Sequence, residues 1–504
     1  MNLKRQIKLG AFLSYIGIFL NIVAGVLTTP LIIRSIGNSS YAVYSLVFSV
    51  INTFLIDLGL GSATSKYIAK YKTENNQTAV NDIFGLILKL FIILSAVLIV
   101  FFGLWIAFSE YIYKGLTPNE ISSFKICLTI TAIYSICSFP FVTFDGVLNA
   151  YEKFVQAKLI TIINRVVLTG SLLVCIFLNA GLYSLIICHA GAALVLVVSK
   201  IYFVYRYTPA RPNLSFRNKS QLKNVAMFSV WVTVATLANR LIFNICPSIL
   251  GIVSTSNEIA IFGIITTIES YIYVIVTAIN TMFLATVTRI FSRENPKEHL
   301  IPLLNKVGKY QFFINGLIVV GFIVLGKTFL QLWVGSDFIP AYYGLVLILV
   351  PGLFYNSLQI ANTTMIVTDK IKYHAITEII AGVVNVSLCF PLGHAYGALG
   401  ISLSICIAFI VRTISDNIIC IFILKLPMKS FYLQVYLRMF LPVIVTSALG
   451  ILTSQYVDVA SIFGFVRVGL VITFIYIFLS FTIGFSSSER LYLYSRVLKR
   501  TNNE

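Results

Sequence analysis

Residues 379–411 read IIAGVVNVSLCFPLGHAYGALGISLSICIAFIV and contain no Asp, Glu, Lys or Arg. About 20 apolar residues suffice for one helix to cross the hydrocarbon core of a bilayer. Pro391, Gly393 and Gly397 lie near the middle of this stretch, and residues of these types favour a turn. The stretch therefore predicts two membrane helices that are joined by a short hairpin.

The same pattern recurs along the whole chain. Of the 504 residues, 58% are hydrophobic and 11% are charged, whereas soluble domains contain roughly 25% charged residues. The mean hydropathy is +0.92, and these values together exclude a soluble globular fold. Further stretches without Asp, Glu, Lys or Arg cover residues 35–56, 90–109, 126–144, 166–199, 338–368, 439–457 and 468–488.

Breaks at charged or Gly/Pro-rich segments divide the chain into predicted spans of an all-α membrane protein. An apolar run at residues 9–33 follows a basic N-terminus, but it is too long for a signal peptide and many spans follow it. Asn179, Ala180 and Gly181 predict a turn inside one long stretch. We expect fourteen helices, centred near residues 22, 52, 96, 135, 169, 194, 238, 273, 318, 355, 384, 411, 445 and 474.

The 37 Lys and Arg residues are distributed unevenly about these spans. Most lie near the two termini and in one set of alternate loops, for example at residues 66–72, 206–223, 289–309 and 490–500. Basic residues collect on the cytoplasmic side of membrane proteins, so we expect a multi-pass protein of the bacterial cytoplasmic (inner) membrane with both termini in the cytoplasm. Because these residues form small groups at membrane edges, the net charge of +19 indicates topology and anionic lipid, and no nucleic-acid partner.

A constant offset in the sequence relates two halves of the chain. It aligns Pro30 with Pro247, Asp145 with Asn362, and Gly181 with Ala398. Equivalent positions are six spans apart, so the halves share one orientation and predict a pseudo-twofold axis along the membrane normal, with the substrate site between them. The predicted division is an N-terminal lobe at residues 1–206, a C-terminal lobe at 207–425, and two further helices with a cytoplasmic tail at 426–504.

Spans 1, 2, 7 and 8 each carry polar residues along one helical face. Polar groups are costly within a bilayer, so such faces favour a wet cavity. Small and hydroxyl residues also mark helix-to-helix packing, and both interpretations stay open for spans 1 and 2, whereas a charged residue favours the cavity for spans 7 and 8. The candidate substrate-binding residues are Asn21, Arg34, Asn52, Asp57, Arg240, Asn244, Glu269 and Asn280.

Arg240 is the candidate with the clearest chemistry. A cation near the middle of a span costs about 2.5 to 3.5 kcal/mol on insertion scales, and Arg forms bidentate hydrogen bonds to phosphate. The alternative role for Arg240 is an ion pair with Glu269 inside the protein. Arg412 and Asp416 are four residues apart on span 12 and are expected to neutralise each other.

Residues for catalysis or metal binding form no recognisable set. The eight cysteines lie in apolar stretches without metal-ligand spacing, and the four histidines do not cluster. Gly59 and Gly61 lack the strand and helix context of a nucleotide-binding loop. We therefore expect no catalytic residues, no metal site and no cofactor, apart from coupling to an H⁺ or Na⁺ gradient. A glycan polymerase or ligase is disfavoured because the predicted outer loops are short.

Three local patterns lie in the first third of the chain. They are Pro30-Leu-Ile-Ile-Arg34, Asp57-Leu-Gly-Leu-Gly61, and Asp145-Gly-Val-Leu-Asn149 followed by Ala-Tyr-Glu152-Lys153-Phe154. The chain resembles the polysaccharide-flippase branch of the multidrug/oligosaccharidyl-lipid/polysaccharide (MOP) exporter superfamily, the Wzx-type flippases of O-antigen and capsule units. The resemblance implies two six-helix lobes, a cavity lined by spans 1, 2, 7 and 8, and alternating access by rocking.

The same resemblance implies a substrate and partners. The protein would carry a polyprenyl-pyrophosphate-linked oligosaccharide across the membrane for cell-surface polysaccharide assembly, with membrane lipid and other assembly proteins as partners. Desolvating sugar hydroxyls and phosphate charges is costly, so such a substrate does not cross the bilayer unaided. The alternative is a MATE-type exporter that exchanges Na⁺ or H⁺ for an organic cation through carboxylates such as Asp57, Asp145 or Glu269.

Overall fold

The computed structural model describes residues 3–291, 296–368, 370–487 and 489–490. All regular elements within these ranges are helices, so the expected all-α membrane protein is confirmed. The chain forms two compact units, Met1–Gly263 with Val386–Ala398, and Ile264–Asn385 with Leu399–Glu504. The lobe boundaries after residues 206 and 425 stay a prediction. Some basic residues of the predicted cytoplasmic edge lie outside the described residues, namely Arg293, Arg496, Lys499 and Arg500.

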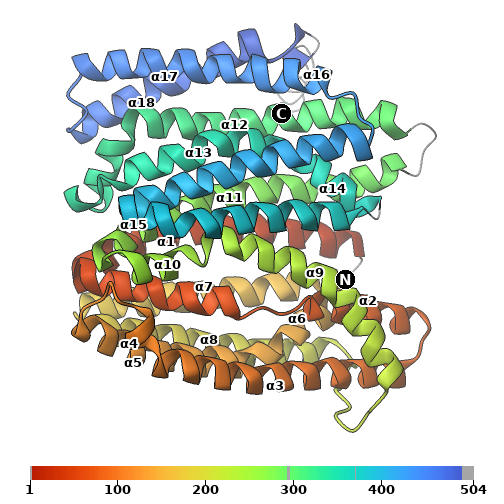
Figure 1. Ribbon diagram of the computed structural model, residues 1–504. Helices are drawn as coiled ribbons and strands as arrows, with labels where there is room; N and C mark the ends of the chain where they lie inside the picture. Colours follow the sequence, from red (N-terminus) through yellow and green to blue (C-terminus); the bar gives the residue numbers. More distant parts are fainter. Residues whose placement is uncertain (1–2, 292–295, 369, 488, 491–504) are drawn as a thin grey trace. The chain divides into compact units, whose positions relative to one another are not determined.

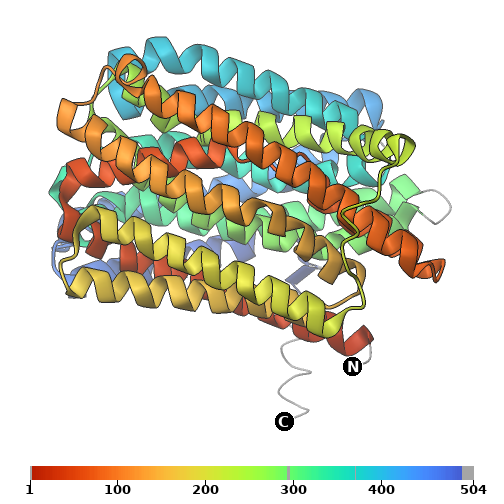
Figure 2. The ribbon, with the colours of Figure 1, turned by 90° about the horizontal axis from the view of Figure 1, so that it is seen from below.

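The first unit consists of long apolar helices and short connections (Figure 1). Within it, α7 and α8 run side by side, as Figure 2 shows in yellow, and α1 packs against α5 and α7. The elements are α1 (Leu3–Phe54), α2 (Leu60–Thr73), α3 (Gln77–Ala107), α4 (Ser109–Ile112), α5 (Pro118–Ser138), η1 (Phe139–Phe141), α6 (Val142–Ala150), α7 (Phe154–Phe177), α8 (Gly181–Tyr207), α9 (Lys219–Phe243) and α10 (Cys246–Val253).

The second unit is built around α12, which packs against α13 and α17, and α17 in turn packs against α18. Two helices, α11 and α15, contribute residues to both units. The elements are α11 (Ser256–Phe291), α12 (Pro296–Trp333), η2 (Ser336–Phe338), α13 (Ala341–Ser357), α14 (Gln359–Val367), α15 (Ile371–Ile418), η3 (Ile419–Ile423), α16 (Lys429–Phe431), η4 (Tyr432–Leu437), α17 (Arg438–Tyr456), α18 (Ile462–Leu479) and η5 (Ser480–Gly484).

The number of membrane crossings depends on how broken helices are counted. Among the described residues, 10 helices are long and apolar enough to span a bilayer, or up to 12 if each of two bent helix pairs is one span. The helices α1 and α15 each contain a non-helical residue at which two helices meet, Gly37 and Gly397. Fourteen crossings require that both of these kinked helices cross twice, so that number stays a prediction.

The last helix shows how the sequence separates a packed face from an outer face. In α18, Ile472 and Tyr476 are buried and lie four residues apart, on one face of the helix. Phe463 and Phe474 are 81% and 73% exposed. Large exposed apolar side chains of this kind are unfavourable in water but are the expected surface of a helix that faces lipid.

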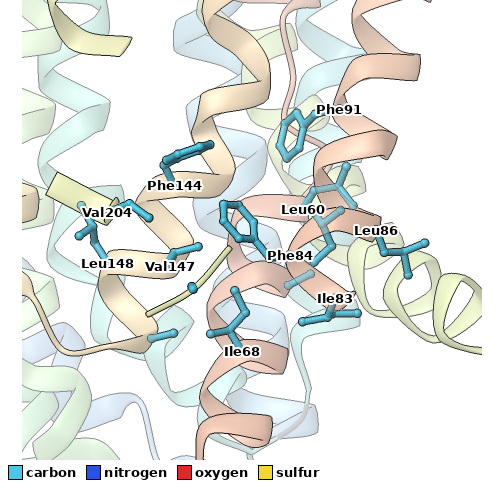
Figure 3. Packing of buried hydrophobic residues seen from close by; sticks show 14 of the residues in the cluster. Leu60, Ile68, Ile83, Phe84, Leu86, Phe91, Phe144, Val147, Leu148 and Val204 are labelled. Atoms are coloured by element: carbon cyan, nitrogen blue, oxygen red, sulfur yellow. The ribbon is translucent and has the colours of Figure 1, made fainter. Parts of the chain in front are cut away.

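A cluster of buried apolar side chains joins α2, α3, α6, α7, α8 and α9 of the first unit, and Figure 3 shows part of it. Phe84 of α3 lies against Phe144 of α6, with the ring centroids 5.3 Å apart in an edge-to-face arrangement. Leu60 of α2 and Val204 of α8 belong to the same cluster. Within a membrane, such close packing holds helices together because lipid tails remove most of the hydrophobic driving force.

Two carboxylates stabilise the breaks in the longest helices. Near Gly37 of α1, Ser39 Oγ donates to Glu120 Oε1 at 2.6 Å, and Glu120 also closes a capping box with Thr117 at the start of α5. At the break in α15, the backbone N–H of Ala398 donates to Glu258 Oε2 at 2.7 Å. Each carboxylate therefore accepts hydrogen bonds from a segment where the regular helix is interrupted.

The predicted turn positions can be compared with the observed ones. The turn at Asn179, Ala180 and Gly181 is confirmed, because α7 ends at Phe177 and α8 begins at Gly181, whose φ is +75°. In the stretch quoted first, the break falls at Gly397, while Pro391 lies within the helix.

Replacing Gly397 with Ala is expected to destabilise the protein. Gly397 has φ +56° and ψ −133°, a conformation that costs a residue with a Cβ about 1 to 3 kcal/mol, and the added Cβ would meet the Glu258 carboxylate. Thermal unfolding of the purified protein in detergent measures the effect. Gly103→Ala is the matched control, since a Cβ there meets nothing within 4 Å; equal melting temperatures for both variants would contradict the argument.

We expect the stability of the folded protein to depend on pH through Glu489. It accepts hydrogen bonds from Lys309 Nζ at 2.8 and 3.0 Å and from the backbone N–H of Ser486 at 2.8 Å. Burial raises the pKa of Glu489, but these hydrogen bonds outweigh it and hold the pKa below the ordinary value. Because its pKa is lower in the folded than in the unfolded protein, ionised Glu489 stabilises the folded state at pH values above the unfolded-state pKa of about 4.3. This stabilisation is lost as the pH falls through the folded-state pKa.

Glu489→Gln should therefore lower the melting temperature at pH 7 more than at pH ~4, because Lys309, 1% exposed, loses its counter-charge. Glu110→Gln removes an exposed ion pair with Lys125 and is the control, for which little change is expected. If Glu489→Gln lowers the melting temperature equally at both pH values, the stabilising role of ionised Glu489 would be refuted.

Candidate functional site

Arg240 lies in the last turn of α9 and binds the end of another helix. Its Nη1 donates to the backbone carbonyl of Asn52 and, at 3.1 Å, to that of Leu55. These carbonyls belong to the C-terminal end of α1, where backbone acceptors lack helical partners and carry partial negative charge. Arg240 also interacts electrostatically with Asp57. A guanidinium with a fork of donors suits this position because it satisfies several acceptors at once.

The segment between α1 and α2 carries the Asp57-Leu-Gly-Leu-Gly61 pattern. Leu58 and Gly59 have φ of +51° and +67°, and the backbone N–H of Gly59 donates to Asp57 Oδ1 at 3.2 Å. A Cβ at Gly61 would approach Asp57 Oδ2 to 3.0 Å. The two glycines therefore allow a tight turn that holds the Asp57 carboxylate beside the Arg240 site.

The other predicted site residues occupy several places. Asn244 accepts from Ser49 Oγ through its backbone carbonyl, and the carbonyl of Asn21 accepts from Arg165 Nη2 at 3.0 Å. Asn280 Oδ1 accepts from Gln311 Nε2 in the second unit, while Arg34 is exposed. The structure thus brings Arg240, Asn52 and Asp57 together; Glu269 and Asn280 belong to the second unit. Substrate binding by any of these residues stays a prediction.

The second unit contains a buried group of charged residues that the sequence did not bring together. Arg412 Nη2 donates to Glu378 Oε1, and His374 Nε2 lies 3.6 Å from the same oxygen. The expected mutual neutralisation of Arg412 and Asp416 is corrected: the ion pair of Arg412 is with Glu378, on the preceding half of α15. Asp416 Oδ1 instead accepts from Thr377 Oγ1 at 3.1 Å.

Several polar atoms of this group have no hydrogen-bond partner among the residues that the structure describes. They include Glu378 Oε2, Asp416 Oδ2 and Arg412 Nε, although these three residues are at most 5% exposed. A buried polar atom without a partner costs about 1 to 3 kcal/mol. Unpaired atoms of a native site call for an explanation such as a role in function.

Two aromatic residues and a third carboxylate surround the ion pair. The guanidinium carbon of Arg412 lies 3.9 Å from the ring centroid of Tyr355 on α13, a cation–π contact. Glu269 and Tyr273 of α11 interact electrostatically with Arg412. The group therefore draws on α11, α13 and both halves of α15, all within the second unit.

Among the described residues, the carboxyl groups around Arg412 outnumber its guanidinium. Three carboxylates, Glu269, Glu378 and Asp416, interact with the one guanidinium of Arg412. Burying an uncompensated ion costs several kcal/mol even after relaxation of the protein. The arrangement is therefore suited to bind and release a proton or another cation, because neutralising one carboxylate changes its energy strongly.

The spacing of ionisable residues in the sequence could have identified the members of this group. His374 with Glu378, and Arg412 with Asp416, are two charged pairs at i, i+4 spacing on otherwise apolar spans. The pairing of Arg412 with Glu378 could not be read from that spacing, since it depends on how the two halves of α15 pack. The signal identifies the residues but not their partners.

Asp145, one of the carboxylates that the exporter alternative would use, forms an ion pair within the first unit. Its Oδ2 accepts from Lys200 Nζ at 2.7 Å, and the Lys200 side chain is 8% exposed. Only Lys200 is buried, because the Asp145 side chain is 42% exposed. Removing Asp145 would leave the buried Lys200 charge without compensation, so the pair has a structural role within the first unit.

Solved structures of membrane transporters have a fold similar to that of this chain. A search of curated proteins finds no match. Among solved structures, "Lipid II flippase MurJ, inward closed conformation" is 16% identical with a TM-score of 0.73, covering 93% of this chain and 98% of that one. An inward-facing MATE family multidrug transporter of the MOP superfamily is 16% identical with a TM-score of 0.65, covering 81% and 96%. At these identities the likeness shows the fold alone.

A third similar structure is a MOP superfamily transporter from Pyrococcus furiosus, at 16% identity and a TM-score of 0.61, covering 83% of this chain and 95% of that one. The family model described as "Polysaccharide biosynthesis protein" matches residues 7–289, which is more than half of the chain. The resemblance inferred from the sequence is thereby confirmed at the level of family and fold. The chain belongs to the polysaccharide biosynthesis protein family, and its fold is that of the MOP superfamily of membrane transporters.

Proposed function

We propose that this protein is a flippase that moves a polyprenyl-pyrophosphate-linked oligosaccharide from the inner to the outer leaflet of the cytoplasmic membrane, for assembly of a cell-surface polysaccharide such as O-antigen. The observation that carries the proposal is the family match over residues 7–289 on a transporter fold. The family and fold are those of membrane transporters and not of enzymes. Both termini are proposed to lie in the cytoplasm.

Arg240 is proposed to contact the pyrophosphate. It is already held in place by the carbonyls at the end of α1, so little side-chain entropy would be lost on binding a phosphate. Asp57 beside it would keep the site from binding an anion too tightly for release. Asn21, Arg34, Asn52, Asn244, Glu269 and Asn280 are proposed as further contacts along the path, with membrane lipid and other polysaccharide-assembly proteins as partners.

The carboxyl groups around Arg412 are proposed to couple transport to a proton gradient. Protonation of Asp416 would remove one negative charge near Arg412, and deprotonation would restore it. A change of one buried charge can bias a two-state transporter only if the two states bind the proton with different affinity. Asp416 Oδ2, which has no hydrogen-bond partner among the described residues, is the atom that would take the proton.

A second function is a MATE-type exporter of organic cations. The observation that favours it is the same surplus of carboxylates, together with a fold that MATE transporters share. Resistance to cationic dyes on expression, with an unchanged surface polysaccharide in a deletion strain, would support the exporter and contradict the flippase.

The flippase proposal is tested by depleting the protein in its own cell. Lipid-linked oligosaccharide should then accumulate on the cytoplasmic leaflet, where an added glycosidase cannot reach it from outside the cell. If depletion causes no accumulation, the flippase proposal is wrong.

Arg240→Gln should reduce transport at least about tenfold, since it removes charge-assisted hydrogen bonds worth about 1.5 to 3 kcal/mol each. Arg240→Lys keeps the charge and should retain part of the activity. Arg438→Gln, an exposed residue of α17, is the matched control and should transport normally. Transport is measured in cells that contain equal amounts of each variant in the membrane; normal transport by Arg240→Gln would exclude its role.

Asp416→Asn should uncouple transport from the proton gradient. In reconstituted vesicles, an imposed pH difference should accelerate the wild-type protein but leave the variant at its gradient-free rate, because an amide does not titrate. Asp458→Asn, at an exposed position between α17 and α18, is the control and should behave as wild type. Acceleration of Asp416→Asn by the pH difference, or of the wild type by Na⁺ alone, would contradict the proposed proton site.

A further inference from the structure

A hollow of about 340 Å³ lies between the last turns of α11 and the first turns of α12, within the second unit. From α11 it is lined by Thr286, Arg289 and Ile290, whose spacing of three and four residues places them on one helical face. Its volume falls at the lower end of the range of ligand pockets, about 300 to 1,000 Å³. None of the polar features discussed above belongs to this hollow.

Two cationic side chains line the hollow. Arg289 and Lys306 line it together with His299, all three exposed, and none of its described lining residues is acidic. The positive end of the α12 macrodipole adds to this potential, because α12 begins at Pro296, close to His299. An anion is the ligand that these side chains would attract.

Apolar side chains also line the hollow. Ile290 is 8% exposed, and Leu303 packs on a small buried cluster formed by Val287, Val307 and Ile360. A free inorganic anion would not be stabilised by these apolar side chains. A ligand with a charged head and a hydrocarbon part would contact both the cationic and the apolar side chains. The basic segment around residues 289–309 lies at a predicted membrane edge, where lipid headgroups are found.

We propose that this hollow binds the phosphate group of a membrane lipid. Arg289 would form the bidentate contact, Lys306 would add a point charge, and the Thr286 hydroxyl would donate one hydrogen bond, while the start of the lipid chain or glycerol lies against Ile290 and Leu303. The phosphate could be that of an anionic phospholipid or of an isoprenoid carrier. The site does not depend on the proposed flippase function.

Binding is tested with the purified full-length protein in detergent, by native mass spectrometry and by the melting temperature, as short-chain phosphatidylglycerol is added. We expect saturable binding that the variant Arg289→Gln/Lys306→Gln weakens about tenfold or more, equivalent to ~1.4 kcal/mol. Arg438→Gln, which removes an exposed charge elsewhere in the second unit, should bind as wild type. Equal binding by wild type and the double variant would overturn the proposal.

A second variant separates loss of the site from loss of folding. Thr286→Phe fills the hollow without changing the charge and should also weaken binding; unchanged binding there places the lipid elsewhere and overturns the proposal. Phosphatidylcholine bound as tightly as phosphatidylglycerol, or inorganic phosphate bound as tightly as either, would likewise contradict it.

The source of the phosphate is decided by competition. Displacement of phosphatidylglycerol by a polyprenyl phosphate at lower concentration assigns the site to the carrier, and the reverse order assigns it to phospholipid. Transport by the double variant is measured in parallel. If the double variant loses lipid binding but still transports, the site is supported independently of the flippase. If the wild-type protein binds lipid but does not transport, only the proposed function is refuted.

Discussion

Charged and polar groups inside a bilayer must find partners within the protein, and this constraint organises the whole structure. Water is absent from the hydrocarbon core, so a backbone carbonyl or a carboxylate left alone there costs several kcal/mol. The chain meets this demand by placing its charges in pairs or against helix ends. Lys200 with Asp145 and Arg412 with Glu378 are side-chain pairs, while Arg240 binds the carbonyls at the end of α1.

The same constraint explains where the long helices break. A helix can be interrupted only where the freed backbone groups are satisfied. A carboxylate lies near each of the two glycine breaks and accepts a hydrogen bond, from a side chain in α1 and from a backbone N–H in α15. Glu120 accepts from Ser39, near Gly37, and Glu258 accepts from the backbone of Ala398 beside Gly397. Breaks that are held in this way are fixed bends, and they give a bundle of long helices defined points at which the chain changes direction.

One group of charges is only partly satisfied, and it differs from the others for that reason. In the described part of the chain, three carboxyl groups lie around the single guanidinium of Arg412, and one oxygen each of Glu378 and Asp416 has no hydrogen-bond partner there. A protein that only needed stability would gain by replacing such a group with apolar residues. In a transporter, such a group of buried charged residues can be useful, because adding or removing one proton can favour one conformation over another.

The sequence predicted the class of fold well because charge-free stretches and turn residues are local signals. The turn at Gly181 and the break at Gly397 follow from glycine among apolar residues, and the membrane-protein class follows from composition. The number of crossings stays undetermined, since a kinked helix can cross once or twice with the same sequence. The site was harder to predict, because the partners of Arg240 are backbone carbonyls and Arg412 pairs with Glu378, which is distant in the sequence. Only tertiary packing creates such contacts.

Reconstitution shows whether this protein moves a lipid-linked oligosaccharide between leaflets, as we propose. Purified protein is placed in vesicles whose inner leaflet contains a fluorescent polyprenyl-pyrophosphate-linked oligosaccharide, and the rate at which the sugar becomes accessible to an external lectin is measured. We expect a rate well above that of protein-free vesicles. A rate equal to that of protein-free vesicles, from protein that is folded and inserted, would contradict it.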